Sequence, residues 1–369
     1  MRRSETVLLT GYPGFKARSM LERLLQSGHR VFVLVRDRHI KAAEKDIQQL
    51  LTATQKGECV ILEGDITKLD LGLSGQEIQH IIDEVEVIHH MAEMFHLGGN
   101  RRMIHSVNVE GTRRILGIAA EMNSLRRMCH YSSAQVAGTL EGVILEDELE
   151  CGQSFHNAYE STKFQAESLV RRVMDRIPVT ILRPSILVGS TKTGLIDKAS
   201  GAHVILAIFI NLPPNVPLPL PGKGHFPLNL VPAGYVVEAA YHLSRKHEAV
   251  GRTFHLTDPN PLSVKGVFDL VSDLAQRPRP LDQAANLIPY RVARAILRLP
   301  PVDKRVKGAG HMLDALHSLA IYSRINTDTL LSSEEAQCPP FTSYASRLVA
   351  ELRAIELYDI ELNIQDEIL

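Results

Sequence analysis

The sequence predicts an α/β fold, a doubly wound parallel sheet that carries a smaller, mostly helical C-terminal lobe. Two observations lead to this prediction. Over the first two thirds of the 369 residues, short apolar runs alternate with amphipathic stretches, which is the pattern of parallel strands joined by helices. Prolines then cluster between residues 212 and 221, and this density of proline excludes regular structure there.

The alternation assigns the elements in order. In the first predicted helix, Met20, Leu21, Leu24 and Leu25 recur at helical spacing. The predicted strands are Thr6–Thr10, Val31–Val35, Val60–Leu62, Val85–His89, Arg127–Ser132, Val179–Leu182 and Thr253–Leu256. The predicted helices lie near Lys16–Gln26, Lys41–Ala53, Met103–Ala120, Ala158–Met174 and Gly234–Ser244.

Composition excludes several classes of function. Hydrophobic residues make up 44% and charged residues 22%, and the formal net charge of -1 gives no reason to expect a nucleic-acid partner. The 16 histidines and four cysteines form no cluster with metal-ligand spacing, so we expect no metal. Val7–Leu9 is too short for a signal-peptide core and Val204–Ile210 too short for a membrane span. Because the cysteines also lie far apart, we expect a cytoplasmic protein.

A glycine loop follows the first strand and opens the first helix. From Gly11 to Ala17 its pattern is Gly-x2-Gly-x2-Ala. Gly11 allows a tight turn, Gly14 lets the backbone approach a pyrophosphate, and Ala17 permits close packing of the helix on the strand. The N–H groups at the start of the helix would face the phosphates. The loop therefore indicates a dinucleotide-binding Rossmann domain, with a structural turn as the alternative.

The order of the predicted strands and helices also suggests how the chain is divided into domains. We expect residues 1–189 and 227–260 to form the dinucleotide-binding domain, because strand–helix alternation resumes after the proline-rich stretch. Residues 190–226 and 261–369 would form the substrate lobe.

The end of the second strand bears on the choice of cofactor. Arg36 offers a guanidinium fork for the 2'-phosphate of NADP, where an acidic residue would bind the ribose hydroxyl of NAD. NADP(H) is therefore preferred, with Arg38 or Lys41 as helpers. Asp37 leaves NAD(H) open, since Arg36 could also be a solvated cation. After the third strand, Asp65 would accept from the adenine amino group or serve only as a turn residue.

Tyr159 and Lys163 are the candidate acid-base pair. Four residues apart on a helix, they share one face. An ammonium beside the phenol favours the phenolate and would lower the tyrosine pKa towards working pH. Ser133, at the end of a strand, would orient a substrate oxygen towards Tyr159, with Ser132 as the competing candidate. Asn108 lies in mid-helix, where asparagine is disfavoured, so we favour a structural role for it.

Six motifs resemble those of the extended short-chain dehydrogenase/reductases, in the order of that family and over about residues 6–260. They are Thr10-Gly11-x2-Gly14-Phe15, Gly64-Asp65, Asn108-Val109-x-Gly111-Thr112, Ser132-Ser133-Ala134, Tyr159-x3-Lys163 and Arg183-Pro184. Finer motifs resemble the branch that contains thioester reductase domains and fatty acyl-CoA reductases. These are Leu34-Val35-Arg36, then Gly64-Asp65-Ile66-Thr67 before Leu71-Gly72-Leu73-Ser74, and Arg183-Pro184-Ser185-Ile186-Leu187-Val188-Gly189 before Thr193-Gly194.

The resemblance implies hydride transfer between nicotinamide C4 and a substrate carbon. Tyr159 would donate or accept the proton, Lys163 would lower its pKa and bind the nicotinamide ribose, and Ser133 would polarise the carbonyl. The implied cofactor-binding set is Thr10, Gly11, Tyr12, Pro13, Gly14, Phe15, Arg36, Asp65, Ile66, Met91, Ala92, Asn108, Lys163 and Pro184.

Two positions depart from the family pattern. The segment from Ala233 to Val236 lacks the usual aspartate, and Met91-Ala92-Glu93 stands where the family has Ala-Ala after the fourth strand. Both positions are expected near the cleft, where they would alter the handling of substrate.

The predicted substrate lobe contains two apolar segments. Val204–Ile210 would form a wall for an acyl chain or sterol, or else core or oligomer packing. Leu287–Leu299 places Arg291, Arg294 and Arg298 on one side of a helix. Such a helix suits peripheral contact with an anionic membrane surface, although packing on its own domain is the commoner case.

The sequence thus predicts an NADP(H)-dependent oxidoreductase that acts on a hydrophobic carbonyl, thioester or alcohol, either a small molecule or carrier-bound. A 3β-hydroxysteroid or sterol-type dehydrogenase is the first alternative. A nucleotide-sugar epimerase or dehydratase is disfavoured by Arg36 and the apolar lobe, and a non-catalytic NADP-sensing protein by the intact catalytic set. The sequence does not fix the oligomeric state; the family resemblance implies a homodimer formed through the helices Met103–Ala120 and Ala158–Met174.

Overall fold

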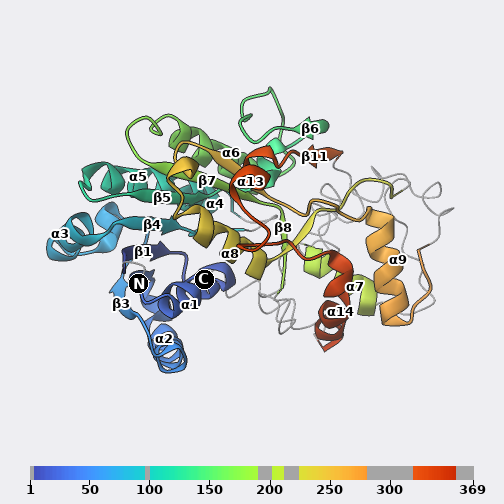
Figure 1. The fold of residues 1–369 in the computed structure, drawn as a ribbon, viewed down its shortest axis with the longest axis horizontal. Coiled ribbons are helices and arrows are strands. Elements are labelled where there is room, and N and C mark those ends of the chain that lie inside the picture. Colours follow the sequence, from blue (N-terminus) through green and yellow to red (C-terminus); the bar gives the residue numbers. More distant parts are fainter. Residues whose placement is uncertain (1–3, 96–99, 190–201, 212–223, 281–318, 355–369) are drawn as a thin grey trace.

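A seven-stranded sheet in the order β10-β7-β5-β4-β1-β2-β3 forms the centre of the protein, and each neighbouring pair is parallel (Figure 1). The computed structural model describes residues 4–95, 100–189, 202–211, 224–280 and 319–354. This sheet confirms the predicted fold class. Its strands are β1 (Thr6–Thr10), β2 (Arg30–Val35), β3 (Glu58–Glu63), β4 (Val87–His90), β5 (Arg127–Tyr131), β7 (Val179–Pro184) and β10 (Thr253–Leu256).

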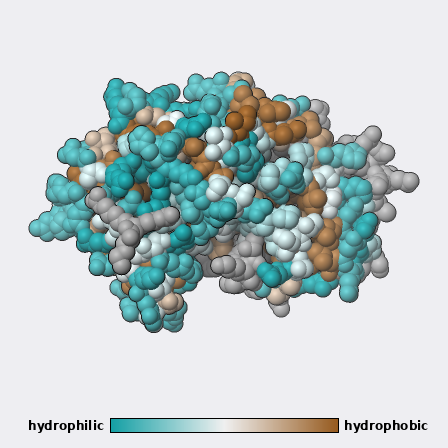
Figure 2. Space-filling model, viewed as in Figure 1, coloured by the Kyte–Doolittle hydropathy of each residue, from teal (hydrophilic) through white to brown (hydrophobic). Residues whose placement is uncertain are grey.

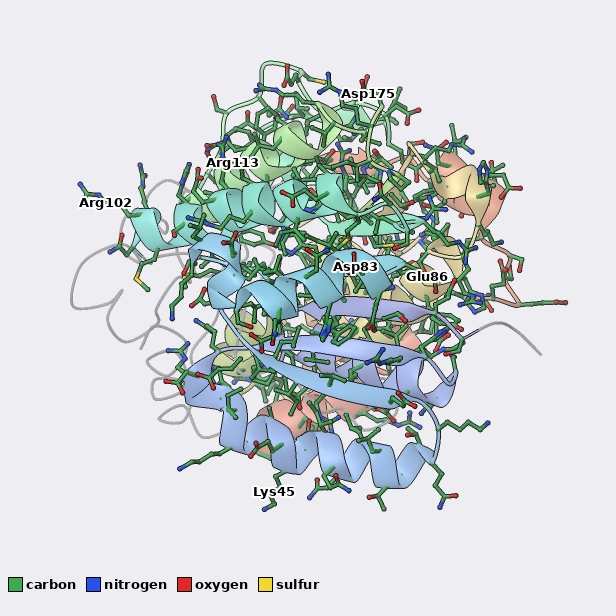
Figure 3. The ribbon with its side chains drawn as sticks, turned by 90° about the vertical axis from the view of Figure 1, so that its left-hand side faces the viewer. Lys45, Asp83, Glu86, Arg102, Arg113 and Asp175 are labelled. Carbon is green, nitrogen blue, oxygen red and sulfur yellow. The ribbon has the colours of Figure 1, made fainter. Side chains whose placement is uncertain are left out.

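Helices cover both faces of the sheet, and the apolar side chains on each face form a separate core cluster. Figure 3 shows Lys45 pointing outwards from the helix below the strands, and Arg113 on a helix above them. On one face lie α1 (Phe15–Gln26), α2 (Ile40–Thr54) and α8 (Ala233–Leu243). On the other lie α3 (Gly75–Glu84), α5 (Gly111–Glu121) and α6 (Ala158–Arg171).

Several predicted elements differ from those observed in their ends, and two of them are informative. The strand predicted from Val85 begins at Val87, because Val85 still caps the C-terminus of α3. The helix predicted over Met103–Ala120 consists of α4 (Arg101–His105), a π-helical segment η3 (Ser106–Glu110) and α5. Such π-segments occur often at functional sites, and this one contains Asn108. Short 3₁₀ turns are η1 (Asp37–His39), η2 (Leu69–Gly72), η4 (Ala134–Ala137), η5 (His247–Ala249) and η7 (Phe341–Ser343).

A smaller core lies beside the sheet. It is built from α7 (Ala202–Asn211), α9 (Val264–Ala275) and α14 (Ala345–Ala354), next to the short parallel pair β8 (Ile186–Val188) and β9 (Leu230–Pro232). The rings of Phe209 and Phe268 meet edge to face, with centroids 5.1 Å apart.

The apolar stretch predicted over Val204–Ile210 contributes to this small core. Leu206, Ala207, Phe209 and Ile210 are buried in it, so their role is core packing, the second of the two interpretations. Leu287–Leu299 and the proline cluster at 212–221 lie outside the described residues.

Residues 320–331 lie beside the main sheet without joining it. The strand β11 (Ala320–Tyr322) pairs in parallel with β6 (Gly142–Ile144), and α13 (Ile325–Leu330) packs against β10. Figure 2 shows hydrophobic side chains gathered over β6 and β11, where Val143 is 62% and Ile321 is 55% exposed. The segment therefore belongs to the sheet-bearing part of the molecule, although the predicted division placed it in the lobe.

A fully buried ion pair holds α6 against the sheet. Glu167 accepts from Arg183 of β7 on both carboxylate oxygens, over 2.7 and 3.0 Å, and both side chains are fully buried. Ser132 donates to the same carboxylate over 2.6 Å, and Arg171 pairs with it over 2.9 Å. Burial alone would raise the pKa of Glu167, but Arg183, Arg171 and Ser132 together lower it to about 2.

Replacing Glu167 by Gln should destabilise the fold by about 3–5 kcal/mol, because it leaves the Arg183 guanidinium buried without a counter-charge. Urea unfolding of the two proteins at pH 7 measures the difference in the free energy of unfolding. Glu44→Gln, a change at an exposed position on α2, is the matched control and should change stability by less than about 0.5 kcal/mol.

The same pair gives the stability a definite dependence on pH. The pKa of Glu167 is lower in the folded chain, about 2, than its ordinary 4.5, so its contribution is complete above pH 4.5 and is lost as the pH falls towards 2. Glu167→Gln should therefore flatten the loss of stability between pH 5 and pH 3. If the free energy of unfolding falls as steeply between pH 5 and pH 3 in Glu167→Gln as in the wild-type protein, Glu167 is not the source of this pH dependence.

Candidate functional site

The sheet has its topological switch point between β1 and β4, which pair in parallel at its centre. In open sheets of this kind, ligands bind beyond the carboxyl ends of the two strands that flank the switch. The glycine loop follows β1 at this edge, and Met91, Ala92 and Glu93 follow β4. These two segments therefore flank the expected crevice.

Gly11 fits this place only because it has no side chain. A Cβ there would lie 2.7 Å from the backbone N of Ala92 and the carbonyl carbon of Met91, and the φ of Gly11 is +96°. Both the close approach of the two loops and the left-handed backbone require glycine. The predicted tight turn at Gly11 is thus present.

The N-terminus of α1 is suited to an anion. Its N-cap is Gly14, which has no side chain to cap the helix, and its first turn contains no acidic residue. By contrast, side chains cap α3 and α6 at Ser74 and Asn157. The N–H groups that begin α1 can therefore face the phosphates of a dinucleotide. The residues present fit that cofactor.

Some residues of the predicted cofactor set have structural contacts as well. Thr10 is buried, and its hydroxyl meets Nδ1 of His90 at 2.9 Å and accepts from Ala92 N over 3.2 Å, so it ties β1 to β4. The Tyr12 hydroxyl donates to Asp46 of α2. Tyr12 and Pro13 thus lie in the loop, but the Tyr12 ring is committed to α2.

The residues after β2 and β3 lie at the same edge of the sheet. Arg36 follows β2 directly and is exposed. The carboxylate of Asp65 accepts from the backbone N and the hydroxyl of Thr67, over 2.8 and 2.7 Å. Those contacts are of the turn-capping kind named as the alternative for Asp65. Ile66 is buried against Gly111, in the core beneath α5.

Tyr159 and Lys163 lie on the first two turns of α6 and are both buried. The two strand-end serines differ in their partners. Ser133 forms a hydrogen bond with Tyr159 and accepts from Gln135 N over 3.2 Å, whereas Ser132 is committed to Glu167. Of the two candidates, the structure brings only Ser133 to Tyr159.

Glu93 lies among these residues. Its Oε2 accepts from the Tyr159 hydroxyl over 3.2 Å and pairs with Lys163 Nζ at 3.0 Å. Its Oε1 pairs with Lys16 from the first turn of α1. Lys163 also donates to the backbone carbonyl of Tyr131. The carboxylate therefore links the cofactor loop to the catalytic helix.

The electrostatics differ from the prediction made for a bare Tyr–Lys pair. Burial raises the pKa of Tyr159 well above 10, Glu93 raises it further, and the hydrogen bond with Ser133 opposes them. Burial would also raise the pKa of Glu93, but Lys16 and Lys163 lower it to about 2. Lys163 pairs with Glu93, a carboxylate that it shares with Lys16. Burial and Glu93 raise the pKa of Tyr159, so the expected lowering of the tyrosine pKa is absent from this arrangement.

Asn108 supports the site from η3. Its side-chain oxygen accepts from Met94 N over 2.8 Å, and its nitrogen donates to the Met94 carbonyl over 3.2 Å and to the Thr162 hydroxyl over 3.0 Å. It therefore fastens the loop after β4 to α6. These contacts are those of a structural residue, the role favoured from the sequence.

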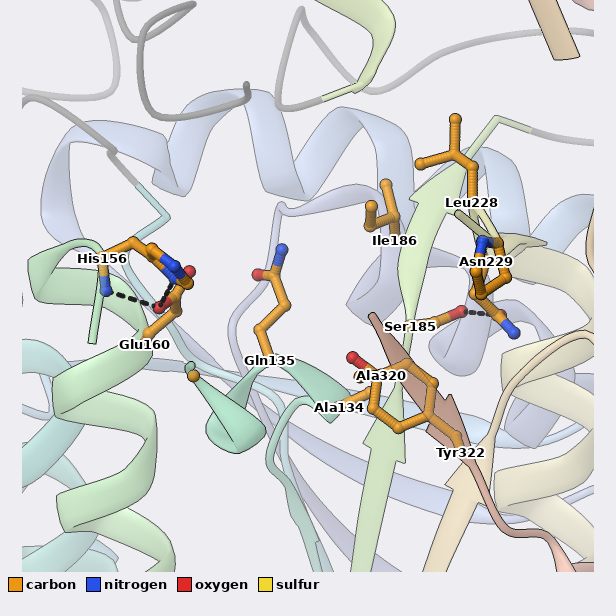
Figure 4. A pocket seen from close by; sticks show the side chains of 12 residues that line it. Ala134, Gln135, His156, Glu160, Ser185, Ile186, Leu228, Asn229, Ala320 and Tyr322 are labelled. Atoms are coloured by element: carbon orange, nitrogen blue, oxygen red, sulfur yellow. Dashed lines mark hydrogen bonds and ion pairs between the residues drawn. The ribbon is translucent and has the colours of Figure 1, made fainter. Parts of the chain in front are cut away.

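A pocket opens beside the catalytic residues (Figure 4). In Figure 4, Gln135 points into it between His156 and Ile186. His156 Nδ1 lies 3.0 Å from the Glu160 carboxylate at one end of the pocket. Lining it are Ala134, Gln135, Gly138, His156, Glu160, Ser185, Ile186, Pro227, Leu228, Asn229, Ala320 and Tyr322. Ala134 and Glu160 are the chain neighbours of Ser133 and Tyr159, so the pocket lies next to the segments that contain the catalytic residues, although Ser133, Tyr159 and Lys163 do not line it.

The role of two residues was not foreseen from the sequence. Glu93 was noticed only as a departure from the family pattern, and Lys16 was not singled out. The signal was available: an acidic residue directly after a central strand of a parallel sheet lies at the ligand edge. Within the described ranges, no group of three or more His, Cys, Asp or Glu is placed to hold a metal ion. No helix in those ranges is long and apolar enough to cross a bilayer.

Comparison with known proteins is consistent with this site. A sequence model of the male sterility protein family matches residues 9–240. The protein is 27% identical over 236 residues to fatty acyl-CoA reductase wat of Drosophila melanogaster, which covers 53% of this chain and 46% of that protein. It is 26% identical over 239 residues to fatty acyl-CoA reductase 1 of Mus musculus, with the same coverages. The chain spans about half the length of these two relatives.

Solved structures show the same architecture. The terminal R domain of the myxalamid PKS-NRPS pathway superposes with a TM-score of 0.78 at 26% identity, over 95% of this chain and 91% of that one. The reductase domain of a nonribosomal peptide synthetase from Mycobacterium tuberculosis gives 0.68 at 19% identity, over 98% and 92%. Gre2 of Candida albicans, solved with NADPH, gives 0.67 at 18%, over 95% and 98%. The last two show the shared fold alone, and together these matches confirm the resemblance stated from the sequence.

Gly11→Ala should displace the loops after β1 and β4 and weaken dinucleotide binding, because the added Cβ has no space. We expect a loss of stability about 1–3 kcal/mol greater than that of Gly28→Ala. Gly28 also has a positive φ, +79°, but its Cβ would meet nothing within 4 Å, so it controls for backbone strain. Urea unfolding and fluorescence titration with NADPH measure the two effects. Equal losses in the two variants would show that contact with Ala92 is unimportant.

Proposed function

The chain belongs to the male sterility protein family, and we propose that it is an NADP(H)-dependent reductase of the extended short-chain type. Its substrate would be a hydrophobic carbonyl or thioester, held on coenzyme A or a carrier, with the corresponding alcohol as the partner in the reverse direction. The observation that carries this proposal is the meeting of Ser133, Tyr159 and Lys163 at the switch point of the sheet, beside a pocket.

The cofactor, when bound, supplies or accepts the hydride. The residues of the chain do the rest. Ser133 orients and polarises the substrate oxygen, since its hydroxyl already lies against Tyr159. The Tyr159 hydroxyl gives its proton to that oxygen as negative charge develops on it. Lys163 would bind the nicotinamide ribose, and the N-terminus of α1 would hold the pyrophosphate.

The preference for NADP(H) rests on Arg36. This exposed guanidinium follows β2, the strand next to β1, at the edge where the adenosine half of a dinucleotide lies in this fold. A guanidinium binds a 2'-phosphate in a bidentate manner, whereas an acidic residue there would bind a free ribose hydroxyl.

The pocket supports a substrate with a polar reacting end and an apolar body. Gln135 and His156 supply polar groups, and Ile186 and Leu228 supply apolar surface.

The proposal includes a cytoplasmic location, in keeping with four free cysteines, and a dimer formed through the helices at 103–120 and 158–174. It also keeps peripheral membrane contact at residues 287–299 as the basis for reaching lipid substrates.

The substrate class is tested with a panel. NADPH consumption should be seen with long-chain acyl-CoA, acyl carrier thioesters or fatty aldehydes. Reduction of NAD(P)+ by 3β-hydroxysterols, without activity on acyl groups, would replace this proposal by the sterol dehydrogenase alternative.

Tyr159→Phe should lower kcat for aldehyde reduction by about 10²- to 10⁴-fold, because it removes the proton donor. Binding of NADPH should stay within about twofold, since the ring and the helix are kept. Stopped-flow absorbance of NADPH measures the first and fluorescence titration the second. Turnover at the wild-type rate would refute the acid-base role.

Arg36→Ala should weaken NADPH binding by about 10- to 100-fold, the loss of a charge-assisted hydrogen-bonding group. NADH binding should be nearly unchanged, because NADH has no 2'-phosphate. Arg113→Ala, at a position whose side chain is 59% exposed on α5, is the control for loss of a surface cation. An equal loss for NADPH and NADH would contradict the assignment of Arg36.

A further inference from the structure

The Glu93 carboxylate is a charged group in direct contact with the catalytic pair. Tyr159 and Lys163 share its Oε2, at 3.2 and 3.0 Å, and Lys16 occupies its Oε1. The side chain is only 15% exposed, Lys16 14% and Lys163 4%. A carboxylate so shielded from water acts strongly on its neighbours.

The position of Glu93 is imposed by its surroundings. Asn108 binds both backbone groups of the next residue, Met94. The ring of Phe95 packs edge-on against that of Tyr159, with centroids 4.7 Å apart and planes at 74°. The loop after β4 is thus held at the two residues that directly follow Glu93. The backbone of the loop is therefore held by the fold, and the pairs with Lys16 and Lys163 hold the carboxylate itself beside Tyr159.

The charges that face Tyr159 can be named from each neighbouring element. The loop after β4 contributes Glu93 and α6 contributes Glu160, and both disfavour the phenolate. Ser133, after β5, favours it through a hydrogen bond. Lys163 and Lys16 are cations, but each is paired with Glu93. The carboxylate in contact with the hydroxyl is thus the strongest single charge opposing its ionisation.

Two buried histidines on the adjoining strands do not change this balance. Burial lowers the pKa of His90 to about 3 and that of His130 well below its usual 6.5. Both are therefore neutral at pH 7. The charge that Tyr159 experiences comes from the carboxylates and from the two lysines.

We propose that Glu93 is a positioning residue that keeps the Tyr159 hydroxyl protonated and holds Lys163 in place, so that the site is set to donate a proton. This rests on the proposed function and specifies it: the site favours reduction of a carbonyl over oxidation of an alcohol. In the reductive step the O–H bond of Tyr159 breaks and an O–H bond forms on the substrate oxygen, while the nicotinamide cofactor supplies the hydride to carbon. Water then returns a proton to Tyr159.

The test follows the ionisation of Tyr159 in the full-length protein, without substrate. Labelling tyrosine with ¹³C at Cζ reports each phenol by NMR, and the signal lost in Tyr159→Phe identifies this residue among the nine tyrosines. In the wild-type protein, Tyr159 should stay protonated through pH 10. In Glu93→Gln, which keeps the shape and removes the charge, its titration should move at least about one pH unit lower.

A conservative variant separates charge from packing. Glu93→Asp keeps the negative charge, so Tyr159 should stay protonated at the pH where it ionises in Glu93→Gln. Glu44→Gln on α2 should match the wild-type protein. The proposal is wrong if Tyr159 titrates at the same pH in Glu93→Gln as in the wild-type protein. It is also wrong if Tyr159 titrates at the same pH in Glu93→Asp as in Glu93→Gln. Ionisation of wild-type Tyr159 below pH 10 would also overturn it, whether or not the variants fold.

Kinetics distinguish this proposal from the proposed function. The alkaline loss of kcat for aldehyde reduction should begin about one pH unit lower in Glu93→Gln than in the wild-type protein, because the acid is lost sooner. If the NMR shifts occur but no carbonyl is reduced with NADPH, the proposed function fails and the role of Glu93 stands. If carbonyls are reduced and the alkaline limbs coincide, the role of Glu93 fails and the proposed function stands.

Discussion

The buried pairing of Glu167 with Arg183 is the constraint on which the catalytic geometry depends. An ionised carboxylate without a partner would be very unfavourable in the interior. The contact of Glu167 with Arg183 at the end of β7 therefore fixes the position of α6 along the sheet. Tyr159 and Lys163 lie two and one turns before Glu167 on the same helix. Their distance from the switch point is therefore set by a charge that takes no part in the reaction.

The same carboxylate settles the choice between neighbouring serines. Ser132 and Ser133 are equivalent in the sequence, but after β5 they reach different positions along α6. Ser132 points to Glu167 and Ser133 to Tyr159. Because the buried ion pair engages the Ser132 hydroxyl, the Ser133 hydroxyl is the one that lies beside Tyr159.

Much of the fold could be predicted from the sequence because its signals are local. Apolar runs such as Val31–Val35 and the helical spacing of Leu21 and Leu24 depend on neighbours in the chain. Gly11 and Gly14 indicate a glycine loop, because the conformation of such a loop depends on only a few consecutive residues. The seven strands of the sheet were therefore all foreseen, with shifts of one or two residues at their ends.

The rest depends on residues that meet only after folding. The strand β11 exists because residues 320–322 find β6, about 180 positions earlier, and neither segment has a pattern of its own. The pairing of Lys16 with Glu93 joins residues 77 positions apart. A Tyr–Lys pair one helix turn apart predicts a lowered tyrosine pKa. The pKa of Tyr159 instead depends on three parts of the fold that meet at its hydroxyl: the loop after β4, the residues after β5, and α6.

Glu146 has a consequence for how the protein can be divided. It is buried and accepts from His255 N over 2.9 Å, from the Thr327 hydroxyl over 2.7 Å, and from the backbone N of Asn326 and Thr327. The sheet and residues 326–327 thus share one carboxylate. A fragment ending at residue 260 would retain the cofactor loop and every catalytic side chain, yet would leave that acid without most of its donors. The catalytic part of this chain is therefore not a module that can be excised: its integrity extends at least to α13.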